Sequence, residues 1–92
     1  MTTYYSVNEA KCKCIPVDFF YKLTNGNIVS IIMKADLGKT IVANYCDEKD
    51  LWYLIGETGL SWLTTDKLHT VIAIMHATGT ISEVEFVERL ES

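Results

Sequence analysis

Residues 17–35 decide the predicted fold, and they read VDFFYKLTNGNIVSIIMKA. Apolar side chains occupy every second position from Val17 to Leu23, which is the period of a strand with one buried face. The dipeptide Asn25-Gly26 comes next and is the strongest short hairpin signal, because both residues tolerate the positive φ angles of a type I′ turn. A second run, rich in Ile and Val, continues to Ala35. The stretch therefore predicts a β-hairpin.

Two further strands follow this hairpin. They are predicted at residues 40–46 and 51–55, and polar turns at residues 36–39 and 47–50 precede them. Because each turn is short, neighbouring strands are expected to run antiparallel. The first half of the chain is thus predicted to be a four-stranded meander.

The remainder of the chain reads as helical. Thr64, Thr65 or Asp66 can cap the first predicted helix, which ends before Gly79. Ser82 and Glu85 form a capping box, which predicts a second helix up to about Leu90. The apolar stripe of the first helix consists of Leu68, Val71, Ile72 and Met75.

These elements predict an α+β fold, a four-stranded antiparallel meander followed by a C-terminal helical hairpin. The meander covers residues 17–55 and the helical hairpin covers residues 64–90, within a single domain of residues 1–92. The apolar side chains of residues 1–13 do not repeat with the period of a helix or a strand, so this segment is predicted to form a partly ordered arm.

Length, composition and charge restrict the class of protein. The chain has 92 residues, 49% of them hydrophobic, a composition that folds rather than stays disordered. The formal net charge of -4 argues against a protein that follows phosphate backbones. The sequence has no apolar run of the about 20 residues that a membrane span needs, and no signal-peptide core. We therefore expect a cytoplasmic protein that contacts no membrane.

Turn lengths set the predicted strand register and, with it, the two faces of the sheet. They pair Ile32 with Ala43 and Ala43 with Leu54, so the helices would cover the face that carries these residues. The opposite face would then be apolar as well, which predicts a homodimer. The residues of this predicted dimer face are Phe20, Val29, Ile31, Met33 and Val42.

Two alternatives to the dimer follow from the same pattern. The N-terminal arm, with Tyr4, Tyr5 and Val7, could fold across the second face and cover it. A register slip of one residue would instead exchange the two faces of a strand. The sequence leaves both alternatives open.

The sequence contains no recognised catalytic or metal-binding motif. Cys12 and Cys14 are spaced too closely for a structural zinc pair, and His69 and His76 would lie about 10 Å apart along a helix. Cys46 stands beside two acidic residues, which disfavour its thiolate. We therefore expect no metal, no cofactor and no enzyme activity.

Acidic residues gather in one turn and near the end of the sequence. One interpretation is a solvated surface whose charges only interact with water. The other is an acidic surface that competes with nucleic acid for a basic groove, because helical neighbours lie about 5–6 Å apart, close to the spacing of successive phosphates. The candidate residues are Asp47, Glu48, Asp50, Glu83, Glu85, Glu88 and Glu91.

The length, the acidic charge, the lysine bias and the lack of a catalytic motif resemble those of small early proteins of large lytic phages. Among these, the chain is similar to the Arn family of anti-restriction proteins of T-even phages. That resemblance implies a DNA-mimicking dimer that inhibits a host nuclease of the McrBC type, or another DNA-binding protein, in the host cytoplasm. The pattern G-x-I-S-x-x-E-F at residues 79–86 also resembles the helical hairpin of short C-terminal (SHOCT-like) domains.

Two other classes of function remain as alternatives. A nucleic-acid-binding module would stack bases on Tyr21, Phe20 or Tyr53, although Lys22 and Lys34 are nearly the only cations close to them. Because cations are so few, we do not expect direct nucleic-acid binding. The remaining alternative is a structural homodimeric domain.

Overall fold

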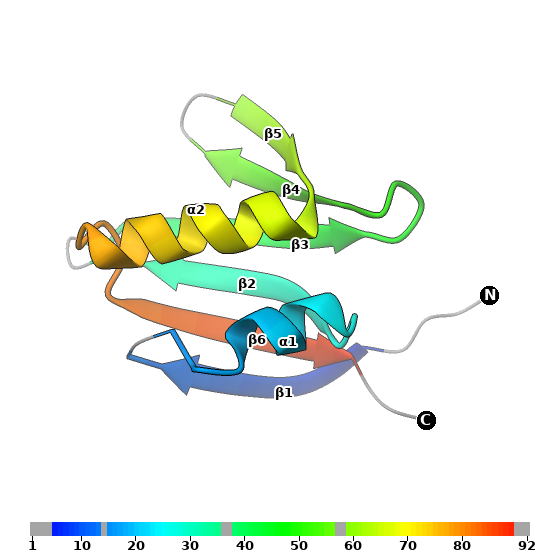
Figure 1. Cartoon of the computed structure of the whole chain (residues 1–92), viewed down its shortest axis with the longest axis horizontal. Helices are drawn as coiled ribbons and strands as arrows, with labels where there is room; N and C mark the ends of the chain where they lie inside the picture. Colours follow the sequence, from blue (N-terminus) through cyan, green and yellow to red (C-terminus); the bar gives the residue numbers. More distant parts are fainter. Residues whose placement is uncertain (1–4, 14, 36–37, 57–58, 90–92) are drawn as a thin grey trace.

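The computed structural model describes residues 5–13, 15–35, 38–56 and 59–89 of the chain. In this part of the chain, six strands form one antiparallel sheet, and both helices lie on the same face of it (Figure 1). Across the sheet the strands follow the order β1-β6-β2-β3-β4-β5. In sequence order the elements are β1 (Tyr5–Cys12), α1 (Phe19–Thr24), β2 (Ile28–Lys34), β3 (Thr40–Cys46), β4 (Leu51–Gly56), β5 (Gly59–Leu63), α2 (Thr65–Ala77) and β6 (Glu83–Arg89).

The predicted fold class is wrong. The structure has neither a four-stranded meander over residues 17–55 nor a C-terminal helical hairpin over residues 64–90, since residues 19–24 are helical and residues 83–89 form a strand. The three middle strands and the long helix do lie where the sequence predicts them, as β2, β3, β4 and α2. The strands β1 and β5 are not predicted from the sequence.

α1 replaces the first predicted strand because its apolar residues fit a helix as well as a strand. Phe19 and Leu23 lie four positions apart, which places them on one side of a helix, and both are buried. The Phe19 ring lies 5.5 Å from the ring of Phe86 in β6. Phe20 and Tyr21 are exposed to solvent. The Asn-Gly pair that follows ends the helix instead of closing a hairpin.

β6 replaces the second predicted helix because its residues alternate between the two faces of the sheet. Val84 and Phe86 are buried beneath the helices, whereas Glu85 lies opposite Ile32 on the other face. β6 runs between β1 and β2, so both neighbours bond to its backbone. These pairings outweigh the local capping signal of Ser82.

The described part of the N-terminal arm forms a strand at one edge of the sheet. β1 pairs with β6, with Ala10 opposite Phe86 and Cys12 opposite Val84. This part of the arm therefore lies in the sheet and does not cross its second face. Tyr4 of the predicted arm lies outside the described residues.

The core lies between the two helices and one face of the sheet (Figure 1). As the sequence predicts, α2 begins after Thr64, whose hydroxyl accepts a hydrogen bond from the Lys67 N–H at 3.3 Å, and it ends before Gly79. Both described helices contribute to this core, and neither is long and apolar enough to cross a membrane. The buried core residues are Phe19, Leu23, Ile28, Ile31, Met33, Ala43, Trp52, Leu68, Ile72, Ile81, Val84 and Phe86.

The register between β2 and β3 differs by one residue from the predicted register. Ala43 lies opposite Ile31 rather than Ile32, whereas the predicted pairing of Ala43 with Leu54 is confirmed. A shift of one residue turns every side chain of a strand to the other face. Ile31 and Met33 therefore lie in the core, and Ile32 lies on the face away from the helices.

Truncation of Ile31 tests this register. The exposed fraction of Ile31 is 0%, so Ile31→Ala should leave a cavity and lower the free energy of unfolding by about 2–5 kcal/mol. The matched control, Ile74→Ala, removes the same atoms from a position on α2 that is 56% exposed, and should change it by less than about 0.5 kcal/mol. Urea denaturation followed by circular dichroism measures both variants. Equal effects would contradict the observed register.

Candidate interaction surface

The sheet face away from the helices carries two neighbouring rows of apolar and aromatic side chains. A row of four residues crosses β2, β3, β4 and β5, each residue lying opposite the next one in the adjacent strand. A pair of aromatic residues beside this row joins β4 to β5. These six residues, which we call the open face, are Ile32, Val42, Ile55, Leu60, Tyr53 and Trp62.

The outer part of the open face is exposed to solvent. Ile55, Leu60 and Trp62 expose 55%, 56% and 40% of their surface. The ring centroids of Tyr53 and Trp62 are 5.5 Å apart, and the Lys49 ammonium lies 4.3 Å from the centroid of the Trp62 ring. Since Lys49 belongs to the β3–β4 turn, this contact places the turn at the border of the open face.

A buried carboxylate lies on the same face of the sheet, in β6 next to β2. Glu85 in β6 is only 6% exposed, and its Oε2 atom lies 3.4 Å from the Lys34 Nζ and 3.5 Å from the Lys11 Nζ. Burial alone would raise the pKa of the Glu85 carboxyl, but the charges of Lys34 and Lys11 outweigh that effect and lower the pKa below its ordinary value. The two lysines hold Glu85 ionised at neutral pH.

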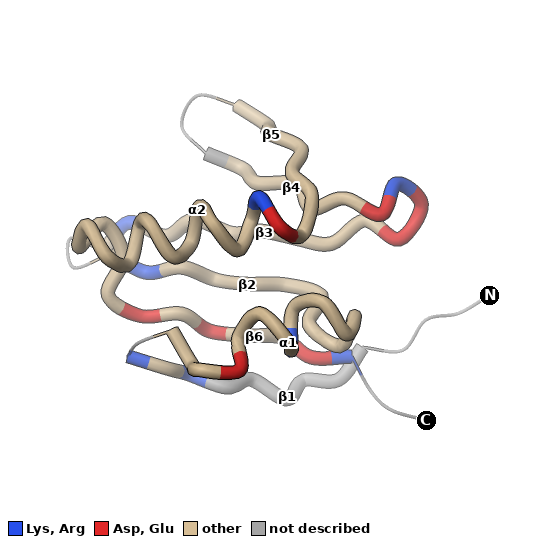
Figure 2. The backbone as a smooth tube through the Cα atoms, in the orientation of Figure 1, with Lys and Arg blue, Asp and Glu red and all other residues tan. Residues whose placement is uncertain are grey.

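The acidic residues that the sequence singles out do not form one surface. Figure 2 shows them divided between the β3–β4 turn and β6. The Arg89 Nη2 atom donates a hydrogen bond to Asp47 at 2.9 Å, which ties the end of β6 to the turn. The acids of the turn, Asp47, Glu48 and Asp50, are exposed; in β6, Glu83 and Glu88 are half-buried and Glu85 is buried; Glu91 lies outside the described residues.

The residues of the predicted dimer face do not share a surface either. Val29, Ile31 and Met33 are buried, the last two in the core beneath the helices. Phe20 is exposed on α1, on the helix side of the molecule, and only Val42 belongs to the open face. The one-residue difference in register accounts for the position of Ile31 and Met33.

The aromatic residues proposed from the sequence as stacking platforms lie on two sides of the molecule. Phe20 and Tyr21 belong to α1, and the Phe20 ring contacts the His69 ring of α2 at a centroid distance of 4.8 Å. Tyr53 belongs to the open face, where its neighbour is Trp62. Sequence reasoning missed Trp62, although its alternation with Leu60 is the period of a strand.

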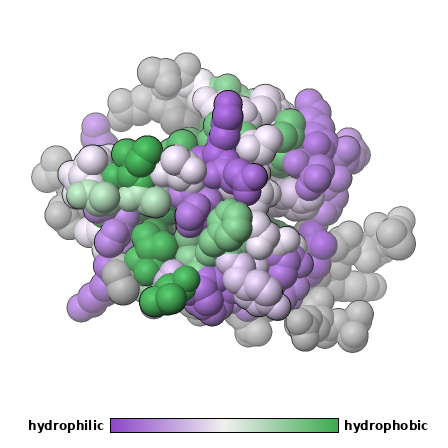
Figure 3. Space-filling view, in the orientation of Figure 1, coloured by the Kyte–Doolittle hydropathy of each residue, from purple (hydrophilic) through white to green (hydrophobic). Residues whose placement is uncertain are grey.

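The helix side of the molecule also exposes hydrophobic side chains. Figure 3 shows them over α2 and over the start of α1. They include Val17, Phe20 and Ile74. Single exposed apolar residues of this kind are common on monomeric proteins.

The candidate metal ligands are dispersed over the fold. Within the described residues, no three His, Cys, Asp or Glu side chains come close enough to hold a metal ion. Cys12 and Cys46 are half-buried thiols outside any disulfide, and Cys14 lies outside the described residues. His69 contacts the rings of Phe19 and Phe20.

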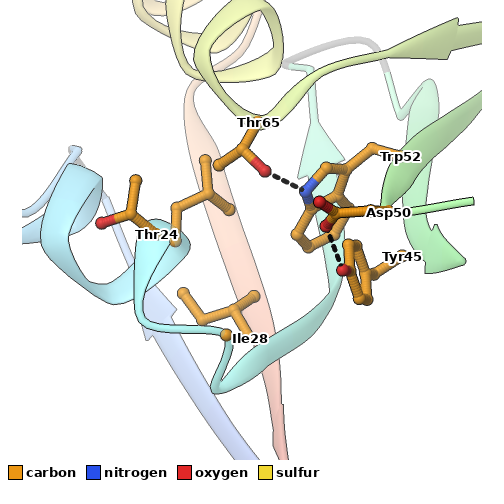
Figure 4. A pocket seen from close by; sticks show the side chains of 8 residues that line it. Thr24, Ile28, Tyr45, Asp50, Trp52 and Thr65 are labelled. Atoms are coloured by element: carbon orange, nitrogen blue, oxygen red, sulfur yellow. Dashed lines mark hydrogen bonds between the residues drawn. The ribbon is translucent and has the colours of Figure 1, made fainter. Parts of the chain in front are cut away.

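A cavity of about 60 Å³ lies between the end of α1 and the β3–β4 turn (Figure 4). The Tyr45 hydroxyl donates a hydrogen bond to the Asp50 carboxylate, and this bond, together with burial, raises the pKa of Tyr45 to about 12. The Trp52 indole N–H donates to the Thr65 hydroxyl at 3.3 Å. Ligand pockets usually measure about 300–1,000 Å³. The cavity is therefore too small for a metabolite, and these polar groups already have partners.

Comparisons with known proteins do not assign a function to the chain. No protein-family model, curated protein or solved structure matches it. The functional interpretation therefore rests on the geometry and charge of the described residues, and above all on the open face.

The charge of Glu85 gives the fold a defined pH dependence. A carboxyl group whose pKa is lowered by folding stabilises the protein above its ordinary pKa of 4.5, and that stabilisation is lost as the pH falls through the lower, folded value. Glu85→Gln should therefore lower the free energy of unfolding at pH 7. Below about pH 5, the free energy of unfolding should fall less steeply with acidification in this variant than in the wild type. Urea denaturation at several pH values measures both changes.

The control for this prediction is Glu48→Gln, which removes one charge from the exposed turn. This variant should keep the pH dependence of the wild type. If Glu85→Gln and Glu48→Gln show the same pH dependence, the two lysines do not hold the Glu85 charge as described.

Proposed function

We propose that the chain is a non-enzymatic protein-binding module that uses the open face together with the acidic β3–β4 turn. The observation that carries this proposal is the uncovered row of apolar side chains that ends in Ile55 and Leu60. An antiparallel sheet with helices on one side normally presents polar residues on the other side. A contiguous apolar surface at that position is typical of an interaction site.

The side chains of the open face suit a protein partner energetically. Aromatic residues are enriched at the centres of protein interfaces, and Tyr53 and Trp62 form such a pair. Burying one large apolar side chain contributes about 1.5–3 kcal/mol. Because Ile55, Leu60 and Trp62 are about half exposed, burying all three contributes about 2–4.5 kcal/mol, which is comparable with the lower estimates of the cost of association, about 4 kcal/mol.

The charge beside the open face indicates the chemistry of the partner. The β3–β4 turn borders this face and exposes Asp47, Glu48 and Asp50, and the whole chain carries a net charge of -4. A complementary partner presents an apolar patch next to a basic rim, as many nucleic-acid-binding proteins do. Inhibition of a host nuclease by acids that imitate phosphates is the specific form of this proposal that the resemblance to phage anti-restriction proteins suggests.

One observation favours nucleic-acid binding as a second candidate. The exposed Trp62 ring stacks with a lysine, and two more lysines, Lys11 and Lys34, approach the same face of the sheet. Aromatic rings beside cations are the elements of a single-strand binding surface. Against this candidate, Lys11 and Lys34 are both paired with Glu85, which leaves less charge for phosphates.

An open-face variant tests the proposal. Ile55→Glu places a charge in the middle of the open face, and Ile74→Glu places the same charge at an equally exposed position on α2 as the control. Wild type and Ile74→Glu should retain the same proteins from a host lysate, and Ile55→Glu should lose them. Affinity capture with mass spectrometry measures this. Identical captured sets for all three baits would contradict the proposal.

Two further assays distinguish inhibition of a nuclease by mimicry from direct nucleic-acid binding. Addition of the protein should protect modified DNA from a purified modification-dependent endonuclease if mimicry is its role, and Glu48→Lys should weaken that protection. A gel shift with single-stranded RNA or duplex DNA that is lost at high salt would favour nucleic-acid binding instead.

A further inference from the structure

β5 forms one edge of the sheet, and no described strand or helix covers its outer side. No strand of the described chain pairs with that side, and Figure 1 shows α2 running along the middle of the sheet and leaving the outer side of β5 clear. We propose that β5 pairs antiparallel with β5 of a second copy of this chain, about a twofold axis at Ser61. The two sheets then form one continuous sheet. This inference does not depend on what binds the open face.

The direction of the free backbone groups follows from bonds elsewhere in the sheet. The Ala35 N–H donates to the Lys39 carbonyl at 2.9 Å, so the odd-numbered residues of β2 bond toward β3. Antiparallel pairs alternate between bonded and non-bonded pairs. The even-numbered residues of β3 therefore bond to β4, and the even-numbered residues of β4 bond to β5. Consequently the N–H and C=O groups of Leu60 and Trp62 point away from the sheet.

Both outward-pointing residues find partners within β5 of the second copy only when Ser61 lies on the twofold axis. Leu60 then pairs with the partner's Trp62, and Trp62 pairs with the partner's Leu60. Both pairs are hydrogen-bonded pairs, so about four backbone hydrogen bonds form across the interface. A foreign strand can bond to the same groups, but a second copy presents Leu60 and Trp62 in reversed order, so the twofold symmetry forms both bonded pairs at once.

The side chains of β5 also permit the pairing. Its sequence, Gly59 to Leu63, contains neither a charged residue nor a proline, the two features that usually protect an exposed edge. The other edge strand, β1, has the exposed charged residue Lys11, which is a protection of this kind. Two copies that each carry a net charge of -4 thus meet through an uncharged strand.

Pairing at β5 also extends the open face. Side chains that lie directly opposite each other in a sheet share one face. Leu60 and Trp62 therefore contact the partner's Trp62 and the partner's Leu60 on the side of the sheet away from the helices. The apolar rows of the two copies then become one continuous surface of about twice the area.

Charges at the twofold axis test the proposal. Ser61 is exposed, so Ser61→Lys should fold as the wild type does, but it places two ammonium groups opposite each other in the dimer. In sedimentation equilibrium, wild type should behave as a dimer at high micromolar concentration, and Ser61→Lys should behave as a monomer. Ser61→Glu should also be a monomer, and an equimolar mixture of the two variants should form dimers again. Circular dichroism checks that each variant is folded.

The control variant is Ile74→Lys, which adds the same charge at an exposed position on α2. It should remain dimeric. A monomeric wild type, a dimeric Ser61→Lys variant, or a mixture that stays monomeric would each overturn the proposal. Sedimentation of Ser61→Lys tests the β5 pairing and partner capture by Ile55→Glu tests the open face, so either proposal can fail while the other stands.

Discussion

The position of β6 between β1 and β2 is the constraint on which the rest of the structure depends. Its buried residues, Val84 and Phe86, determine which face of the sheet the helices cover. Phe86 lies opposite Ile31, which turns the odd-numbered residues of β2 toward the helices and, through the next pairings, fixes the orientation of β3, β4 and β5. One central strand therefore sets which side chains form the core and which form the open face.

The same alternation gives rise to both proposals. Both described helices lie on one face of the sheet, and no described element covers the apolar rows on the other face, which favours a partner that buries them (Figure 1). The alternation of backbone hydrogen bonds, counted from β2 to β5, turns the polar groups of Leu60 and Trp62 outward at the edge. The first proposal depends on side chains and the second on the backbone, which is why separate variants can test them.

The sequence predicts the elements whose local signals agree with their surroundings. β2, β3, β4 and α2 are of this kind, and the pairing of Ala43 with Leu54 follows from the turn between their strands. Residues 19–24 and 83–89 carry signals for both a helix and a strand. The burial of Phe19 and Leu23 and the pairing of β6 with β1 and β2 decide between them. The candidate surface was harder to predict, because a shift of one residue in β2 exchanges its faces, and because β5 follows a glycine that reads as a break.

Nuclear magnetic resonance contacts of Phe86 test the central constraint most directly. If β6 lies between β1 and β2, backbone protons of Phe86 should show cross-strand contacts both to Ala10 and to Ile31, the residues opposite it. Residues 83–89 should show no contacts of the kind that connect positions three apart in a helix. Helical contacts within residues 83–89, without cross-strand contacts from Phe86, would contradict the sheet order and with it the open face.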